Sequence, residues 1–260
     1  MTVVGSSLAL GHWLVIRAWA LVLRAPHDFP RRMRYNSPAM TPAAQVACLI
    51  PVAYVLGSVP FGLIVGLAKG KDPRLHGSGN IGATNVARVL GGKRWFFLVF
   101  VLDLLKSLVP MLVAGRLLRG VEPHAGEYAT WIAVGLAAIL GHVFSLFLKF
   151  RGGKGVATSA GVVLGIWPYL TVPGLIAIGV FAVVFLISRY VSLGSIVAAA
   201  SLPVLYVAVG LTRTPRWPVL DDQLPLLVAA VLVAVMIVAK HKANIARLMA
   251  GTENKFTTRR

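Results

Sequence analysis

The chain has 260 residues, of which 57% are hydrophobic and only 13% charged, and its mean hydropathy is +0.79. A soluble domain carries about 25% charged residues, and several apolar runs here approach the ~20 residues that cross a bilayer. The composition therefore excludes an ordinary soluble domain and predicts an all-α, polytopic membrane protein.

The formal net charge of +18 would suggest nucleic-acid binding in a soluble protein. Here the cations lie between apolar runs, where orientation in the membrane and anionic lipid headgroups explain them more simply. The sequence contains no nucleic-acid-binding motif. The one cysteine, Cys48, lies in an apolar run, and the six His have no metal-ligand spacing. We expect no metal, no cofactor and no nucleic-acid partner.

Residues 1–39 differ from the rest of the chain. They contain five Arg, a weak apolar stretch broken by Arg17, and the polar segment APHDFPRRMRYNSP. Met40 then opens a segment that leads directly into the first strong apolar run. We predict that residues 1–39 form an atypical extension, disordered or not part of the working protein. Residues 40–260 are predicted to form a single integral-membrane domain.

About seven transmembrane helices are predicted, and their loops differ in charge. The proposed inner segments hold sixteen Lys and Arg, whereas the outer loops after residue 39 hold four. This asymmetry predicts that the C-terminus is cytoplasmic. The predicted spans are 43–68, 95–114, 128–148, 156–166, 170–187, 191–211 and 224–239.

Residues 71–94, between the first two spans, hold most of the chain's polar chemistry, and they contain the glycine-rich stretch GSGNIGATN at 77–85. Glycines allow a ligand to approach the backbone, and successive N–H groups in such a turn form a nest for anions. Ser and Thr hydroxyls and Asn amides add further donors. We predict a site for an anion, with a polar membrane loop as the alternative.

A second glycine-rich turn, RGGKG at residues 151–155, precedes the apolar segment 156–166. A turn that leads into a helix N-terminus is a natural phosphate site, although the spacing of a Walker A loop is absent. A basic turn at the membrane edge is the alternative. In the second span, Asp103 and Lys106 are either functional groups or a plain ion pair.

Four inner segments carry dense polar clusters: GSGNIGATN, RGGKG, SRYVSLGS and HKANIARLMAGTEN. The outer loops show nothing similar. We therefore predict one site at the cytoplasmic face that joins an anionic headgroup to an acyl-chain groove. A membrane transporter of phosphate esters or other anions is the alternative function, since ionisable residues inside spans and broken helices suit one.

Over residues 52–255 the sequence resembles the bacterial acyl-phosphate:glycerol-3-phosphate acyltransferases of the PlsY type. The motifs GSVPFG, RLHGSGNIGATNVAR, DLLK, GHVFSLFLKFRGGKGVAT and HKANIARLMAGTEN stand in the order of that family. Two departures are Ser145, where the family usually has Pro, and the extension 1–39. The resemblance implies a multi-pass enzyme of the bacterial inner membrane. Its substrates would be acyl phosphate and glycerol 3-phosphate, its products lysophosphatidic acid and phosphate, without an obligate protein partner.

The polar clusters and the resemblance together give candidate roles for single residues. The resemblance supplies those of Ser78, Arg74 or Arg88, the glycines around Lys154, His241, Asn244 and Glu253, and the others follow from the residues themselves. The catalytic candidates are Ser78, one of Arg74 and Arg88, Lys154, His241 and Asn244. Residues with a structural role are Asp103, Lys106 and Glu253. The substrate-binding candidates are Gly77, Gly79, Asn80, Gly82, Thr84, Asn85, Arg151, Gly152, Gly153, Gly155, Ser188 and Ser192.

Acyl phosphate is already activated, so positioning and charge stabilisation can supply most of the rate acceleration. The chain contains no H-x-x-x-x-D motif, which argues against acyltransferases that use that dyad. We expect Ser78 to act as a hydrogen-bond donor rather than a nucleophile, because no His–Asp relay is evident. The base for the glycerol hydroxyl is either His241 or a substrate phosphate oxygen.

Overall fold

The computed structural model describes residues 40–213, 217 and 219–256, and the secondary structure of these residues is entirely helical. The predicted all-α membrane fold is confirmed. The extension 1–39 lies outside the described residues, so the predicted division at Met40 stays a prediction. The helices are α2 (Pro42–Ala47), α3 (Leu49–Ser58), α4 (Phe61–Ala68), α5 (Ala83–Leu90), α6 (Lys93–Leu117), α7 (Ala125–Val143), the short 3₁₀ helix η1 (Leu146–Leu148), α8 (Val156–Gly165), α9 (Thr171–Ser188), α10 (Val191–Leu211), α11 (Leu224–Lys240) and α12 (Lys242–Met249).

All seven predicted spans fall on helices, but they differ in length. Five segments are long and apolar enough to cross a membrane: Pro42–Leu67, Lys93–Leu117, Ala125–Leu148, Thr171–Ser188 and Val191–Leu211. Helix α11 joins α12 through a 58° bend, and the pair makes a sixth. Helix α8 has 10 residues, about 15 Å of helix, which is roughly half the hydrocarbon thickness. The count of seven full spans and the orientation of the C-terminus stay predictions.

Helices α3 and α7 cross closely because each places a glycine at the contact. A Cβ on Gly57 would overlap the backbone of Ala138, and one on Gly141 would overlap the carbonyl oxygen of Tyr54. Such small residues let backbones approach where helices pack in a membrane. Helix α3 ends before Pro60, which lacks an N–H and starts α4 in a new direction.

Helix α6 carries a buried ionic cluster that ties three elements together. Lys106 Nζ lies 2.8 Å from the Asp103 carboxylate and 2.8 Å from Nδ1 of His142 on α7. It also donates to the carbonyl oxygen of Val59, at the break between α3 and α4. Asp103 and Lys106 are thus an ion pair, and His142 is a third member of the cluster. Lys106 also satisfies the carbonyl group of Val59, which the break between α3 and α4 leaves without a helical partner.

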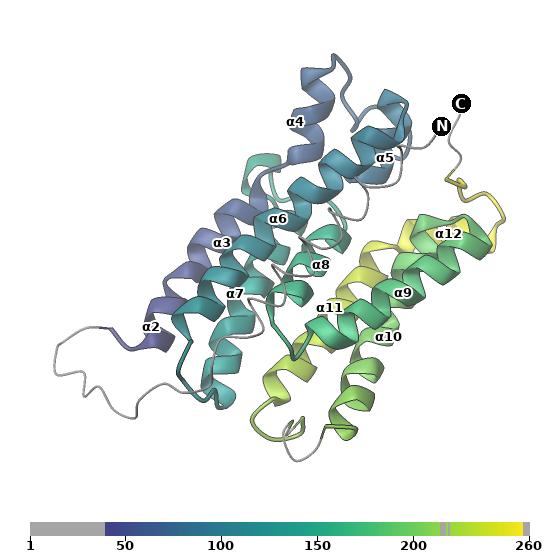
Figure 1. Cartoon of the computed structure of the whole chain (residues 1–260). Helices are drawn as coiled ribbons and strands as arrows, with labels where there is room; N and C mark the ends of the chain where they lie inside the picture. Colours follow the sequence, from purple (N-terminus) through teal and green to yellow (C-terminus); the bar gives the residue numbers. More distant parts are fainter. Residues whose placement is uncertain (1–39, 214–216, 218, 257–260) are drawn as a thin grey trace, which may run out of the picture. The chain divides into compact units, whose positions relative to one another are not determined.

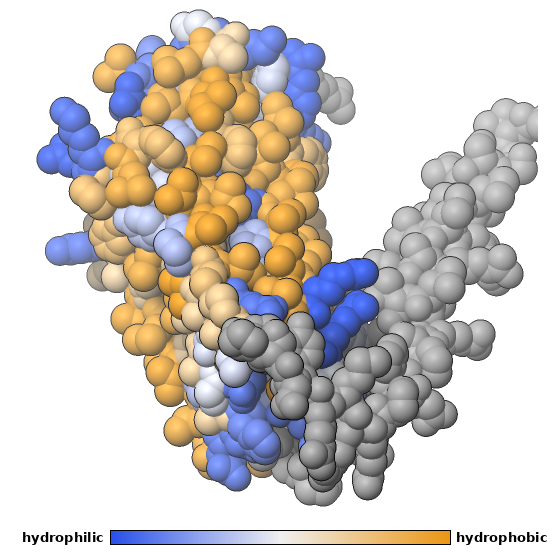
Figure 2. Space-filling view, turned by 90° about the vertical axis from the view of Figure 1, so that its left-hand side faces the viewer, coloured by the Kyte–Doolittle hydropathy of each residue, from blue (hydrophilic) through white to orange (hydrophobic). Residues whose placement is uncertain are grey.

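Helix α6 packs against α8, α9 against α10, and α10 against α11. Figure 1 shows these helices running side by side, with α4, α5 and α12 gathered at their upper end. Apolar side chains cover most of the face drawn in Figure 2. Large apolar residues such as Val204 and Ile187 are 69% and 81% exposed, as expected for a surface that faces lipid.

Helix α5 was not predicted from the sequence, which indicated only a polar loop after residue 70. Its residues, ATNVARVL, bury Asn85, Val86 and Ala87 on one face. The apolar signal is short, and the glycines and asparagines that precede it mask the helix start.

Candidate functional site

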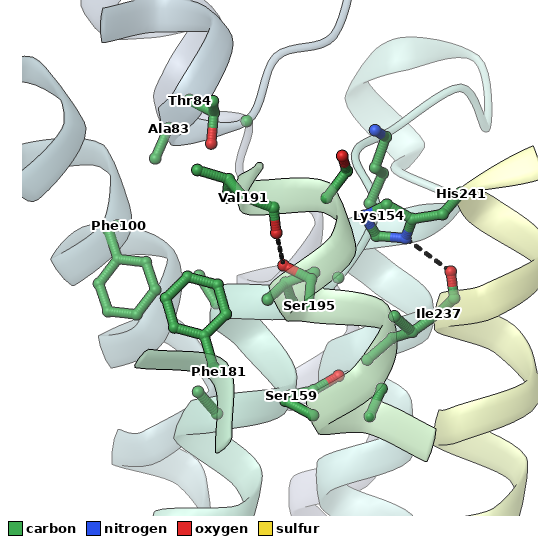
Figure 3. Close-up of a pocket in the computed structure, with 18 of the residues that line it drawn as sticks. Ala83, Thr84, Phe100, Lys154, Ser159, Phe181, Val191, Ser195, Ile237 and His241 are labelled. Carbon is green, nitrogen blue, oxygen red and sulfur yellow. Dashed lines mark hydrogen bonds between the residues drawn. The ribbon is translucent and has the colours of Figure 1, made fainter. Parts of the chain in front are cut away.

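A cavity of about 480 Å³ opens between α6, α8, α9, α10 and α11. All four predicted polar segments contribute to its lining. Ser78 comes from the first, Lys154 from the second, Ser192 from the third and His241 from the fourth. Figure 3 shows Lys154 and His241 side by side on one side of the cavity, with Phe100 and Phe181 on the other. The segments therefore share one site.

The first loop is held in shape by the side chain of Asn85, which is 2% exposed. Its amide nitrogen lies 2.9, 3.1 and 2.8 Å from the carbonyl oxygens of Pro73, His76 and Asn80. Its oxygen accepts the N–H of Ser78 at 2.8 Å. Since the loop itself uses both ends of this amide, Asn85 positions Ser78 rather than offering an amide to a ligand.

The two arginines of the first motif have different surroundings. Arg88, in the last turn of α5, lines the cavity. Arg74 is not among the lining residues, and its guanidinium is 2.6 Å from the Asp72 carboxylate. That salt bridge lowers the pKa of Asp72 and raises the pKa of Arg74. The geometry therefore favours Arg88 as the arginine of the site.

The turn RGGKG is shaped by packing against His142. The N–H of Gly152 donates to the carbonyl oxygen of Val143, and the N–H of Gly153 donates to that of His142, both at 3.0 Å. These two amides are therefore not free for an anion. A Cβ on Gly153 would overlap the imidazole of His142. The turn ends at Gly155 with φ of 84°, in the left-handed region, and begins α8 without a side-chain cap.

Lys154 is bound into a network that crosses the site. Its Nζ donates to Oδ1 of Asn244, whose Nδ2 donates to Oε1 of Glu253 at 2.6 Å. Ser192 Oγ donates to the same Glu253 oxygen at 2.7 Å, and Arg247 Nε to the other oxygen at 2.7 Å. Glu253 thus joins α10 and α12 to the glycine-rich turn.

The polar end of the cavity is short of negative charge. Burial lowers the pKa of Lys154 to about 8, and the neighbouring Arg247 and Arg88 lower it further while Glu253 acts in the opposite direction. Lys154, Arg88 and Arg247 thus share one carboxylate, Glu253, which is already paired with Arg247. The other lining carboxylate, Asp103, is paired with Lys106. A bound phosphate would relieve this imbalance.

His241 stands at the junction of α11 and α12, and its side chain is buried. Nδ1 lies 2.7 Å from the carbonyl oxygen of Ile237. A carbonyl only accepts, so Nδ1 carries the hydrogen, and Nε2 of the neutral ring keeps a lone pair. Burial and the nearby Lys154 lower the pKa of His241 to about 4, so Nε2 of the neutral ring can accept a proton only as a weak base.

Further from the polar end the lining is apolar. No sequence pattern distinguishes these residues from other apolar positions in the membrane helices. Two hydroxyls, those of Ser159 and Ser195, also line this part. The apolar residues include Phe96, Phe100, Leu104, Val163, Ala177, Phe181, Ala199, Leu202 and Val233.

Most of the predicted site residues reach the cavity and some do not. The predicted residues that line it are Ser78, Asn80, Gly82, Thr84, Asn85, Arg88, Asp103, Lys154, Gly155, Ser192, His241, Asn244 and Glu253. Those outside the lining are Arg74, Gly77, Gly79, Lys106, Arg151, Gly152, Gly153 and Ser188. Ser188, for example, caps its own helix by donating to Val184 and accepting from the N–H of Tyr190. His142 lines the cavity and was not singled out from the sequence, since 36 residues separate it from Lys106.

The chain has relatives among known proteins. The chain is 48% identical over 211 residues to a glycerol-3-phosphate acyltransferase of Geobacter sulfurreducens, covering 80% of this chain and 96% of the relative. It is 43% identical over 218 residues to one of Anaeromyxobacter dehalogenans, covering 83% and 100%.

Two solved structures are also similar. They are crystal structures of PlsY (YgiH), described as an integral membrane glycerol 3-phosphate acyltransferase, in its glycerol 3-phosphate and lysophosphatidic acid forms. Both are 38% identical to this chain and cover 82% of it and 96% of their own chain, with TM-scores of 0.70 and 0.68. The family model of glycerol-3-phosphate acyltransferases matches residues 47–251, and the chain therefore belongs to the glycerol-3-phosphate acyltransferase family.

Proposed function

We propose that this membrane enzyme transfers an acyl group from acyl phosphate to the 1-hydroxyl of glycerol 3-phosphate. The products are lysophosphatidic acid and inorganic phosphate. The observation that carries the proposal is the two-part cavity, whose cationic end meets an apolar extension within one space of about 480 Å³. This shape suits substrates that each carry a phosphate, one of them with an acyl chain. The family favours this function over transport of phosphate esters.

The cations at the polar end would hold the phosphates. Lys154 and Arg88 line the cavity beside free N–H groups at the start of α8, where the helix dipole favours an anion. Asn244 orients the Lys154 ammonium, and Glu253 fixes Asn244 in turn. Gly152 and Gly153 then serve the turn rather than the ligand, because their N–H groups are bonded within the protein.

The transfer needs no covalent intermediate on the protein. The glycerol hydroxyl oxygen bonds to the acyl carbonyl carbon, the bond from that carbon to the phosphate oxygen breaks, and phosphate leaves. The hydroxyl proton passes either to Nε2 of His241 or to a phosphate oxygen. Ser78 Oγ has no hydrogen-bond partner among residues 40–256 as described, so it is available to donate to the charge that develops on the carbonyl oxygen.

The polar clusters and the excess of cations lie on the same side of the predicted topology. We therefore propose that the site faces the cytoplasm from the bacterial inner membrane, with the C-terminus on the same side. The enzyme would act without an obligate protein partner.

The test is a reaction of purified protein in lipid nanodiscs with palmitoyl phosphate and labelled glycerol 3-phosphate. Labelled lysophosphatidic acid is the expected product. Palmitoyl coenzyme A replaces the donor in a parallel reaction, and Lys154→Met supplies a variant that lacks the central cation. Equal or better rates with the thioester would exclude acyl phosphate as the donor. Uptake of label into sealed vesicles without product would favour the transporter.

A further inference from the structure

The apolar part of the cavity has one clear direction. On α10, Ser192, Ser195, Ala199 and Leu202 all line it, and their spacing places them on one face of the helix. Ser192 is bonded to Glu253 at the polar end, and Leu202 stands ten residues further along, about 15 Å away at 1.5 Å per residue. The cavity therefore extends along α10 from the phosphate end toward Leu202.

The other helices follow the same course. On α11 the lining residues Val233 and Ile237 are spaced by four, and His241 follows at the same spacing just past the helix end. Helix α8 contributes Ser159 and then Val163. In Figure 3 the wall descends from Lys154 and His241 past Ile237 to Ser159. On α9, Gly174 packs against Val163, since a Cβ there would overlap its side chain.

A second, much smaller cavity of about 10 Å³ lies beyond this end. It is lined by residues of α7, α8, α10 and α11, among them Ile139 and Ala230, and by Leu170 at the start of α9. Four residues line both cavities and so stand between them: Ser159, Val163, Leu202 and Val233. Three of these, Val163, Leu202 and Val233, are apolar and buried.

We infer that Val163, Leu202 and Val233 form the floor of the acyl-chain cavity, and that Leu202 sets the longest acyl chain the enzyme takes. The inference rests on the proposed function. Leu202 is the bulkiest of the three, and it is buried and lines both the large cavity and the small one. A shorter side chain at this position joins the two spaces and admits a longer chain. A bulkier side chain one turn nearer the phosphates excludes part of the chain.

Two substitutions with opposite expected effects test the floor. Leu202→Ala enlarges the cavity at its end, and Ala199→Val narrows it one turn above. For each, kcat/KM is measured with lauroyl, myristoyl, palmitoyl, stearoyl and arachidoyl phosphate at saturating glycerol 3-phosphate. Val204→Ala is the matched control, because Val204 is on the same helix but 69% exposed on its lipid-facing side.

In Leu202→Ala, the ratio of kcat/KM for stearoyl phosphate over palmitoyl phosphate should rise by roughly tenfold, because two further methylenes can be buried. In Ala199→Val the optimum should move to a shorter chain, and in Val204→Ala it should not move. Misfolding cannot explain shifts of the preferred chain length in opposite directions in two active variants. If Leu202→Ala does not fold, a shorter preferred chain in Ala199→Val still tests the inference.

If the wild-type protein is active and both variants keep its chain-length profile, the inference that these residues form the floor is overturned. The acyl chain would then leave the cavity between helices into the bilayer. A wild-type protein that is inactive with every acyl phosphate would overturn the proposed function, and this inference with it. The two failures are therefore distinguishable.

Discussion

The imidazole of His142 occupies the space that a side chain on Gly153 would need. The carbonyl oxygen of His142 also accepts the N–H of Gly153, so the turn and the histidine are fixed to each other twice. The ring is held in place by Lys106 Nζ, 2.8 Å from its Nδ1. A glycine of the predicted phosphate turn is thus required by packing inside the protein, and the turn takes its shape from the buried cluster on α6.

The first prediction follows for Gly153→Ala. The new methyl group should displace the ring of His142 and shift the turn that carries Lys154. We expect a lower apparent Tm in detergent, with both kcat and KM for glycerol 3-phosphate impaired. The control is Gly179→Ala, since a Cβ on Gly179 meets nothing within 4 Å and Ala favours a helix interior by up to about 1 kcal/mol. If Gly153→Ala raised KM alone at unchanged Tm, the methyl group would be meeting the substrate and not the ring.

The second prediction concerns the buried ion pair of Asp103 and Lys106. Lys106→Met leaves the carboxylate without its cation in a buried position, which typically costs ~3–5 kcal/mol. Asp103→Asn combined with Lys106→Met removes both charges and should recover much of that loss. Unfolding by titration with a denaturing detergent measures both variants. Equal losses in the single and the double variant would show that the charge of Asp103 is not what destabilises the single variant.

Much of this fold could be predicted because its signals are local. Each predicted span coincides with a helix, and the polar segments between the spans contain most of the polar residues that line the cavity. The relations that the sequence did not indicate are long-range. No sequence pattern near Lys106 indicates that His142 is its partner. The first motif likewise does not distinguish Arg88 from Arg74, and only the position of α5 shows that Arg88 lines the cavity.

The role of Asn85 illustrates the same limit. As a residue type in a glycine-rich loop it was expected to bind the ligand, because an amide can donate and accept. The structure directs its amide into the loop, to three carbonyl groups and the N–H of Ser78. The glycines and asparagines indicated a loop rich in turns, but not which polar side chains hold the loop in shape.

The third prediction separates the two ends of the Asn85 amide. Asn85→Asp keeps an oxygen that can accept the N–H of Ser78 but loses the donors to the three carbonyl groups. In Ser78→Ala, the loss of one donor to a developing charge should lower kcat by about 10²-fold or more. In Asn85→Asp the carbonyl groups of the loop lose their partner, so we expect kcat to fall at least as far. Steady-state kinetics on inserted protein measure both. Full activity in Asn85→Asp would mean that only the bond to Ser78 matters.

The fourth prediction concerns pH and Lys154. Its pKa of about 8 means that the ammonium loses its charge as the pH rises through that value, while the phosphate of glycerol 3-phosphate, with a second pKa near ~6, is already a dianion. The attraction between them therefore weakens on the alkaline side. We expect kcat/KM for glycerol 3-phosphate to decline as the pH rises through about 8, since this ratio reports the free enzyme.

Two variants assign that decline to Lys154. In Lys154→Arg the guanidinium stays charged, so kcat/KM should be lower but without a decline near this pH. In Glu253→Gln the carboxylate that raises the pKa of Lys154 is lost, so the decline should move to lower pH. Ser192→Ala is the matched control, because it removes a hydrogen bond to Glu253 and leaves its charge. A decline that stays in place in both Lys154→Arg and Glu253→Gln would belong to another group, and the role of Lys154 as the titrating phosphate ligand would have to be abandoned.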